Sequence, residues 1–211
     1  MRPAADHPYF ADAPPIGMSH RGGSTFPPNL GRENTVHAFQ QAVDLGYRYL
    51  ETDVHATSDG RLVAFHDEVL DRVTDSEGTI AEMPWSAVSR ARINGTDAIP
   101  LMDELFETFP EARFNIDVKA DGAVAPLVET IRRHDAVDRV CIGSFSDARL
   151  RRVRRAGPPA PGETEKQEAL QFGDLVIDRA GRRVMRAGVP AHLTPTEFDL
   201  LLCLANAPGT V

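Results

Sequence analysis

Two segments of the chain alternate between apolar and polar residues with a period of two, which is the pattern of a β-strand with two unlike faces. Residues 49–55 carry Glu51 and Asp53 on their polar face, and residues 114–119 carry Asp117 in the same way. Neighbouring carboxylates repel each other, and a shared proton or a bound cation relieves the repulsion. Carboxylate oxygens suit hard ions such as Mg²⁺ or Ca²⁺. The two strands therefore predict a sheet face that either shares a proton between its acids or attracts a divalent cation.

Histidines stand where two further apolar runs end. The run at residues 16–19 ends at His20, and the run at residues 62–65 ends at His66. Loops that follow strands are where barrel enzymes carry their catalytic groups. The sequence therefore indicates an enzyme with histidine chemistry beside the carboxylates. His55 has no comparable support, and a position adjacent to this site is the alternative considered for it.

Helical patterns separate the strands between residues 16 and 157. They cover residues 36–45, 102–109, 123–134 and 147–155. Alternating strands and helices predict an α/β barrel or a doubly wound sheet with parallel strands. Trp85 and Phe145 are expected to be packing residues, with substrate stacking by Phe145 as the alternative.

The composition changes at Gly157. Residues 158–168 are rich in Pro, Gly and charge, as in a linker. Beyond them the pattern predicts a small β-meander and then a helix over residues 197–205, which Thr194 would cap. That helix would place Phe198, Leu201, Leu202 and Ala205 on one face.

Composition limits the class of protein. In 211 residues, 42% are hydrophobic, and the net charge of -8 argues against wholesale nucleic-acid binding. The N-terminal region has neither the apolar run of a signal peptide nor a membrane span, so we expect a cytoplasmic protein. Cys141 and Cys203 lie too far apart in the sequence to indicate a zinc site or a disulfide framework, and are interpreted as buried thiols.

The motifs of residues 17–157 resemble those of the glycerophosphodiester phosphodiesterase family. They are SHRGG, RENT, ETDVHATSDGRLVAFHD, IPLMDELF, NIDVK and GSFSDARL, in family order. The resemblance implies a TIM-barrel hydrolase that splits glycerophosphodiesters into glycerol 3-phosphate and an alcohol with a divalent metal. It implies metal ligands at Glu51, Asp53 and Asp117, an acid/base pair of His20 and His66, phosphate contacts from Arg21 and Lys119, and Glu33 near the metal.

The chain departs from the family in two ways. Asp117 stands where the family usually has Glu, which is similar to the sphingomyelinase D-like barrels and leaves a lipid phosphodiester substrate open. The resemblance ends near Gly157, so we expect a partial barrel of about five of the eight strands. An oligomer could cover its open edges.

Residues 169–211 resemble the start of an OmpR/PhoB-type winged-helix domain, through the LTPTEFDLL motif. The expected organisation is a loose segment at 1–16, the partial barrel at 17–157, the linker, and this domain start at 169–211. DNA binding is not expected, because the recognition helix of that family is missing from the sequence. A DNA-binding regulator fragment and an inactive chimeric product remain the alternatives to the enzyme.

Overall fold

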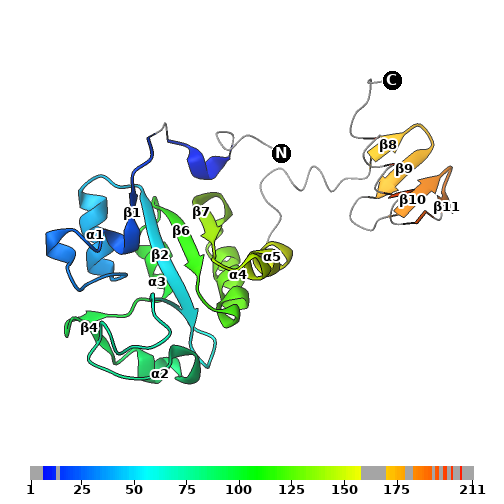
Figure 1. Cartoon of the computed structure of the whole chain (residues 1–211). Helices are drawn as coiled ribbons and strands as arrows, with labels where there is room; N and C mark the ends of the chain where they lie inside the picture. The colour runs from blue at the N-terminus through cyan, green and yellow to red at the C-terminus, as the bar shows by residue number, and fades with distance from the viewer. Residues whose placement is uncertain are drawn as a thin grey trace. The chain divides into compact units, whose positions relative to one another are not determined.

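The computed structural model describes residues 7–12, 15–157, 170–178, 183–191, 193–194, 197–198, 201 and 205. The chain divides into two compact units, Met1–Pro158 and Pro159–Val211 (Figure 1). The expected linker lies outside the described residues. Each unit has a hydrophobic core of its own and is described by itself.

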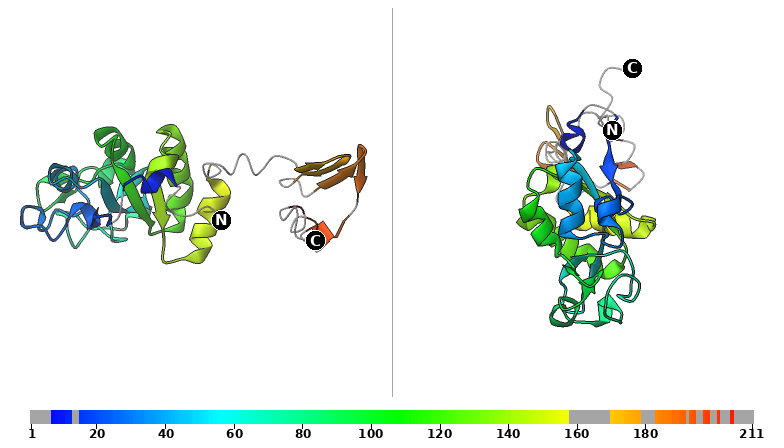
Figure 2. Two further views of the ribbon diagram at one scale, coloured as in Figure 1. Left: turned by 90° about the horizontal axis from the view of Figure 1, so that it is seen from above. Right: turned by 90° about the vertical axis from the view of Figure 1, so that its left-hand side faces the viewer.

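A mixed sheet forms the centre of the first unit, and Figure 2 shows it from two further directions. Its strands are β1 (Met18–Ser19), β2 (Tyr49–Ala56), β3 (Leu62–Ala64), β6 (Arg113–Val118) and β7 (Val140–Gly143). Strands β1, β2, β6 and β7 are parallel and lie side by side in that order. Strand β3 turns back and pairs antiparallel with the end of β2.

The expectation of about five barrel strands therefore needs correction. The sheet does have five strands, but only four run parallel as in a barrel. Residues 62–64 follow β2 after a tight turn at Ser58–Gly60, so they return along β2 instead of crossing over through a helix. Among the described residues the sheet does not close into a barrel.

Helices connect the parallel strands. They are α1 (Val36–Asp44), α2 (Trp85–Val88), α3 (Met102–Thr108), α4 (Val124–Arg133) and α5 (Asp147–Ala156), with short 3-10 turns at Pro8–Phe10, His20–Gly22, Pro27–Asn29, Ile80–Glu82, Asp121–Ala123 and Val137–Arg139. Helix α1 begins where the Thr35 hydroxyl accepts a hydrogen bond from the Ala38 amide at 3.1 Å. Residues 34 and 35 are therefore fixed at the start of a helix, beside the end of β2.

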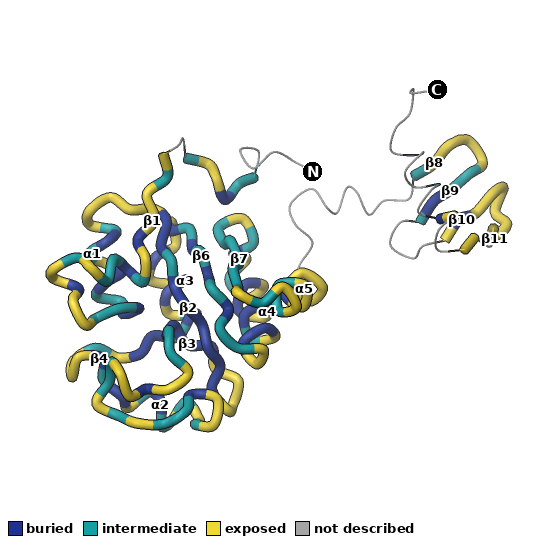
Figure 3. The backbone as a smooth tube through the Cα atoms, in the orientation of Figure 1, coloured by how far each residue is buried: buried dark blue, intermediate teal, exposed yellow. Residues whose placement is uncertain are grey.

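Two apolar clusters hold the first unit together. The larger lies between the sheet and helices α1, α3 and α4 and includes Phe39, Phe106 and Phe114, all at most 1% exposed. The smaller lies under the long loop after β3 and includes Leu70, Ile80 and Ile93. Strand β2 is buried along most of its length (Figure 3), which suits it to hold charged groups at fixed positions.

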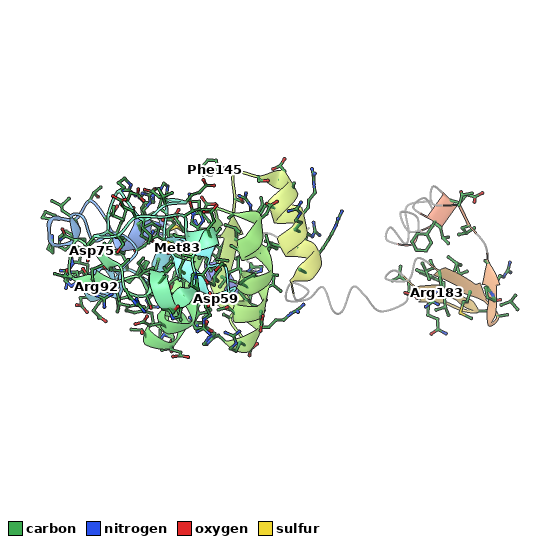
Figure 4. All side chains as sticks on the ribbon, turned by 90° about the horizontal axis from the view of Figure 1, so that it is seen from below. Asp59, Asp75, Met83, Arg92, Phe145 and Arg183 are labelled. Atoms are coloured by element: carbon green, nitrogen blue, oxygen red, sulfur yellow. The ribbon has the colours of Figure 1, made fainter. Side chains whose placement is uncertain are left out.

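The loop after β3 contains a small hairpin that the sequence did not predict. Strands β4 (Arg92–Ile93) and β5 (Asp97–Ala98) have only two residues each, too few to show an alternating pattern. The Arg92 amide donates to the Asp75 carboxylate at 2.8 Å, and the two residues lie together in Figure 4. Arg32 donates hydrogen bonds to both carboxylate oxygens of Asp97 in this hairpin, at 2.6 and 2.7 Å.

The second unit is a four-stranded antiparallel sheet. Its strands are β8 (Leu170–Phe172), β9 (Leu175–Asp178), β10 (Arg183–Arg186) and β11 (Val189–Ala191), in the order β11-β10-β9-β8. Phe198, Leu201 and Ala205 are helical and pack against Ile177 and Val184. The predicted meander and the apolar helix face are therefore confirmed for these residues, while Leu202 lies outside the described part of the chain.

Part of the N-terminal segment is ordered, unlike the loose segment that we expected. Tyr9 is 2% exposed and packs edge-on against Tyr49, whose hydroxyl donates to the Tyr9 carbonyl at 2.9 Å. Cys141 is a free, half-buried thiol, and Cys203 lies outside the described residues. No helix in the described ranges is both long enough and apolar enough to cross a membrane.

Candidate active site

The carboxyl ends of β1, β2 and β6 meet at one edge of the sheet. Strands β2 and β6 pair in register, so Asp53 lies directly beside Asp117. His20 and Arg21 follow β1 at the same edge. Asp53, Glu33 and His66 all act electrostatically on His20. The structure therefore brings together the two histidines and the carboxylates that the sequence singled out.

The turn after β1 directs Arg21 toward the acidic residues of β2. The Arg21 backbone is left-handed, with φ of 51°, and its amide donates to Glu51 Oε2 at 2.9 Å. Its Nε lies 3.2 Å from Asp53 Oδ2. Gly22 follows with φ of 76°, and a Cβ there would lie 2.9 Å from the Cβ of Ala38. Only glycine lets the turn approach α1 this closely.

Lys119 lies between the two aspartates. Its ammonium is 2.9 Å from Asp53 Oδ1 and 2.6 Å from Asp117 Oδ2. Burial lowers the pKa of Lys119, but hydrogen bonds to Asp117 and Asp53 outweigh burial and leave it above its ordinary value. Asp117 Oδ1 is buried and has no hydrogen-bond partner. One aspartate oxygen is thus unsatisfied although a cation is already present.

Glu51 is poorly stabilised as an anion. Burial, followed by repulsion from Asp53, raises the pKa of the Glu51 carboxyl to about 7. The amide and the charge of Arg21 only partly offset this. The carboxylates of β2 therefore experience an excess of negative charge, which a further cation would relieve.

The two histidines differ in their surroundings. The His20 side chain is 63% exposed, with Nε2 3.8 Å from Glu51 Oε2, and burial, followed by the charge of Arg21, lowers its pKa. The Nδ1 atom of His66 lies 2.5 Å from Asp67 Oδ1. The Nε2 atom of the buried His55 lies 3.1 Å from the His66 carbonyl oxygen, so His55 contacts the backbone of the loop that carries His66. His55 thus contacts the loop that carries His66, which agrees with the alternative considered for it.

Three residues of the site, Asn34, Asp67 and Arg72, were not predicted from the sequence. Asn34 donates to Asp53 Oδ2 at 3.0 Å, and Arg72 contacts both Glu33 and Asp67. Asn34 belongs to the RENT motif and Asp67 follows His66, so both had a local signal. Arg72 had none, because its partner Glu33 is 39 residues away in the chain.

The prediction that Phe145 packs in the protein interior is wrong. Its side chain is 99% exposed and projects from the loop after β7 (Figure 4). The Lys119 ammonium lies 5.6 Å from the centre of its ring. Since β7 is an edge strand, no neighbouring strand among the described residues provides a surface for the ring to pack against. Trp85 does pack, against the smaller apolar cluster.

Residues 20–158 match the model of the glycerophosphoryl diester phosphodiesterase family. The chain belongs to this family. The match begins at His20 and includes both histidines, the three carboxylates and Lys119.

Relatives within the family agree with this membership. The chain is 41% identical over 140 residues to "Probable glycerophosphodiester phosphodiesterase 2" of Mycobacterium tuberculosis, covering 66% of this chain and 52% of that protein. It is similar in structure to an Oleispira antarctica phosphodiesterase solved with the product sn-glycerol-3-phosphate, with a TM-score of 0.61 and 26% identity. That likeness covers 67% of this chain and 62% of the solved chain. The chain therefore spans between half and two thirds of each of these two family relatives.

A relative outside the phosphodiesterases was also found. The chain is 32% identical over 149 residues to the transcriptional regulatory protein CseB of Streptomyces coelicolor, which covers 67% of this chain and 64% of that protein. The aligned stretch is longer than the second unit, Pro159–Val211, and so is not confined to it.

The family's divalent cation can be tested against the residues present. In the described ranges no three His, Cys, Asp or Glu side chains converge closely enough to hold an ion. The donor chemistry nevertheless suits one, because five carboxylates face three cationic side chains and one oxygen of Asp117 is unsatisfied. The site of this family member fits a hard cation, provided that Lys119 moves away from the aspartates.

Proposed function

We propose that the chain hydrolyses glycerophosphodiesters and releases glycerol 3-phosphate and an alcohol. The observation that carries the proposal is the meeting of His20, His66 and Arg21 with three carboxylates at the carboxyl end of the sheet. Family membership supports it, and so does the sn-glycerol-3-phosphate found with the Oleispira antarctica phosphodiesterase.

A phosphodiester is an anion, so its binding needs positive groups at the site. Arg21 and Lys119 are the candidates, since both lie within the carboxylate cluster and both carry a fixed charge. In the absence of substrate these cations are paired with Asp53. Binding would exchange a carboxylate partner for a phosphate partner, which keeps the charge of the site balanced.

Cleavage needs one group that accepts the nucleophile's proton and one that protonates the leaving oxygen. His20 and His66 are the proposed pair, because histidine is the side chain that titrates near neutral pH. Asp67 occupies Nδ1 of His66, so Nε2 is the nitrogen that would exchange a proton. The nucleophile can be water or the substrate's own neighbouring hydroxyl.

Glu51, Asp53 and Asp117 are the residues that would hold the divalent cation, Mg²⁺ or Ca²⁺, with Glu33 nearby. When bound, such a cation neutralises charge on the phosphate as the phosphorus is attacked. The raised pKa of Glu51 and the unsatisfied oxygen of Asp117 support this assignment.

A lipid phosphodiester is the second candidate substrate. Asp117 stands where the family usually has a longer carboxylate. Phe145 is 99% exposed beside Lys119, where an apolar chain of the alcohol could contact it. Comparing glycerophosphocholine with a lysophospholipid as substrates separates the two candidates, and Phe145→Ala would weaken the second only.

The test is release of glycerol 3-phosphate from glycerophosphocholine by the purified full chain, with Mg²⁺, with Ca²⁺ and with chelator. We expect cation-dependent turnover that His20→Ala reduces by about 10²- to 10⁴-fold, the usual contribution of acid/base catalysis. His37→Gln is the control, because His37 lies in α1 and makes no hydrogen bond or ion pair with a site residue in the described part of the chain. A folded chain without turnover would contradict the proposal and favour an inactive chimeric product.

We also infer that residues 169–211 are the start of a winged-helix-like domain joined through residues 158–168 to a phosphodiesterase unit at 17–157. The antiparallel sheet with its packed helix and the likeness to CseB support this. Arg183 and Arg186 are paired with Asp178 and Asp174, so we expect no retardation of duplex DNA in a gel shift at about 0.15 M salt. Retardation of the DNA would contradict that expectation.

A further inference from the structure

A chain of charged contacts connects His66 to the opposite side of the site. Asp67 Oδ1 contacts His66 Nδ1 at 2.5 Å, and Asp67 Oδ2 accepts from Arg72 Nε at 2.5 Å. Arg72 also donates to Glu33 Oε1 at 2.6 Å. Glu33 in turn accepts from Arg21 at 3.3 Å. Arg72 therefore links the loop that carries His66 to the loop that precedes α1.

The charge on Asp67 determines which nitrogen of His66 carries hydrogen. The hydrogen bond from Arg72 lowers the pKa of Asp67 to about 2, so the carboxylate is ionised at neutral pH. An ionised carboxylate only accepts hydrogen bonds, hence Nδ1 of His66 must be the donor. When the ring is neutral, Nε2 then has no hydrogen and can act as a base.

Arg72 is held firmly enough to orient its partners. Leu70, two residues earlier, is fully buried in the smaller apolar cluster. The Thr74 hydroxyl donates to the Leu70 carbonyl at 2.9 Å and closes the turn that carries Arg72. The guanidinium donates to both oxygens of Asp67 and to both oxygens of Glu33 from its planar fork, a paired geometry that a lysine ammonium does not reproduce.

We propose that Arg72 is a positioning residue for His66. It fixes Asp67 so that Asp67 accepts Nδ1–H and leaves Nε2 of His66 for proton transfer, and through Glu33 it fixes the His66 loop against the Arg21 turn. The proposal rests on the proposed function only for the role of His66 Nε2 in proton transfer during cleavage. The tautomer itself follows from these contacts whatever the substrate is.

The test is the tautomer of His66 in the full chain labelled with ¹⁵N-histidine, measured by NMR at about pH 8, where histidine is mostly neutral. His66→Gln identifies the signal. We expect Nδ1–H in the wild type and a shift toward Nε2–H in Arg72→Gln. Arg72→Lys keeps the charge without the fork, so we expect a smaller shift, and it is the second variant if Arg72→Gln does not fold.

Arg133→Gln is the matched control. Arg133 contacts Asp103, which also contacts His134, so these three residues repeat the Arg, Asp and His combination on α3 and α4. The side-chain exposures match as well. Arg133 is 51% exposed and Arg72 48%, while Asp103 and Asp67 are each 20% exposed. Arg133→Gln should leave the His66 signals unchanged. If it shifts them as much as Arg72→Gln does, the proposal is wrong.

Kinetics provide the second readout. Arg72→Gln should lower kcat by about tenfold or more with KM little changed, as expected from loss of a charge-assisted contact that orients a reacting group. An unchanged His66 tautomer in Arg72→Gln would overturn the proposal. The expected tautomer in a wild-type chain without turnover would support the positioning role and contradict the proposed function, so the two failures are distinguishable.

Discussion

At the scale of single residues, most charges of the site are already paired with one another. Lys119 neutralises Asp53 and Asp117, and Arg21 contacts Glu51 and Asp53. Asn34 donates to the Asp53 oxygen that Arg21 also contacts, and accepts a hydrogen bond from Thr52 at 2.9 Å. Binding at this site therefore means replacing internal partners, and single substitutions should reveal which partners compete with a ligand.

Lys119→Met should destabilise the cation-free chain and strengthen binding of Ca²⁺. The substitution leaves Asp117 without its cationic partner and Asp53 with Arg21 alone, at a cost of about 1–3 kcal/mol in free energy of unfolding. Added Ca²⁺ should restore stability more in the variant than in the wild type. Denaturation with chelator and calorimetry with Ca²⁺ measure the two effects, and weaker Ca²⁺ binding by the variant would contradict competition.

Gly22→Ala should destabilise the first unit by roughly 2–4 kcal/mol, because it combines a backbone penalty with a steric clash. Gly60→Ala is the matched control, since Gly60 also has a positive φ, 80°, but nothing lies within 4 Å of a Cβ there. The control should lose only about 1 kcal/mol. Urea denaturation measures the free energy of unfolding of both variants. Equal losses in Gly22→Ala and Gly60→Ala would show that a Cβ at residue 22 does not clash with α1.

At the scale of elements, an ion pair joins the β4–β5 hairpin to the loop before α1. Arg32 holds Asp97 through two hydrogen bonds, and this contact lowers the pKa of Asp97 below 3.8. Because the folded chain binds the Asp97 proton more weakly than the unfolded chain does, the contribution to stability is present above about pH 4 and is lost at lower pH.

Arg32→Gln should therefore reduce the free energy of unfolding by about 1 kcal/mol at pH 7, and the difference from wild type should shrink as the pH falls below about 4. Urea denaturation of both proteins across this pH range measures it. A difference that stays constant down to about pH 2 would mean that packing of Arg32, and not its charge, stabilises the hairpin.

Local patterns predicted most of the elements and singled out residues that the structure brings to one edge of the sheet. Alternation placed β6 correctly, with Phe114, Ile116 and Val118 fully buried, and the helical pattern at residues 36–45 placed α1. The sequence did not reveal contacts between distant loops, such as that of Arg72 with Glu33. The turn signal at residues 58–60 did predict a hairpin-like strand after β2, and the antiparallel pairing of β3 with β2 confirms it.

At the scale of the whole molecule, the two units have separate cores. The clusters that include Phe39 and Leu70 belong to the first unit, and the cluster of Ile177, Val184 and Phe198 belongs to the second. Deleting residues 159–211 should therefore shift the thermal unfolding midpoint of the first unit by less than about 2 °C. Calorimetry measures it, and loss of a cooperative transition would show that the first unit depends on the second.

The open sheet has a consequence for how the protein behaves in solution. Among the described residues, β1 and β7 each have one side without a partner strand, and unpaired strand edges bind other chains. Encounters between such edges become more frequent as the chain is concentrated. Specific activity and light scattering should therefore be followed over a dilution series, because an assay at one dilution cannot distinguish a property of the chain from a property of its self-association.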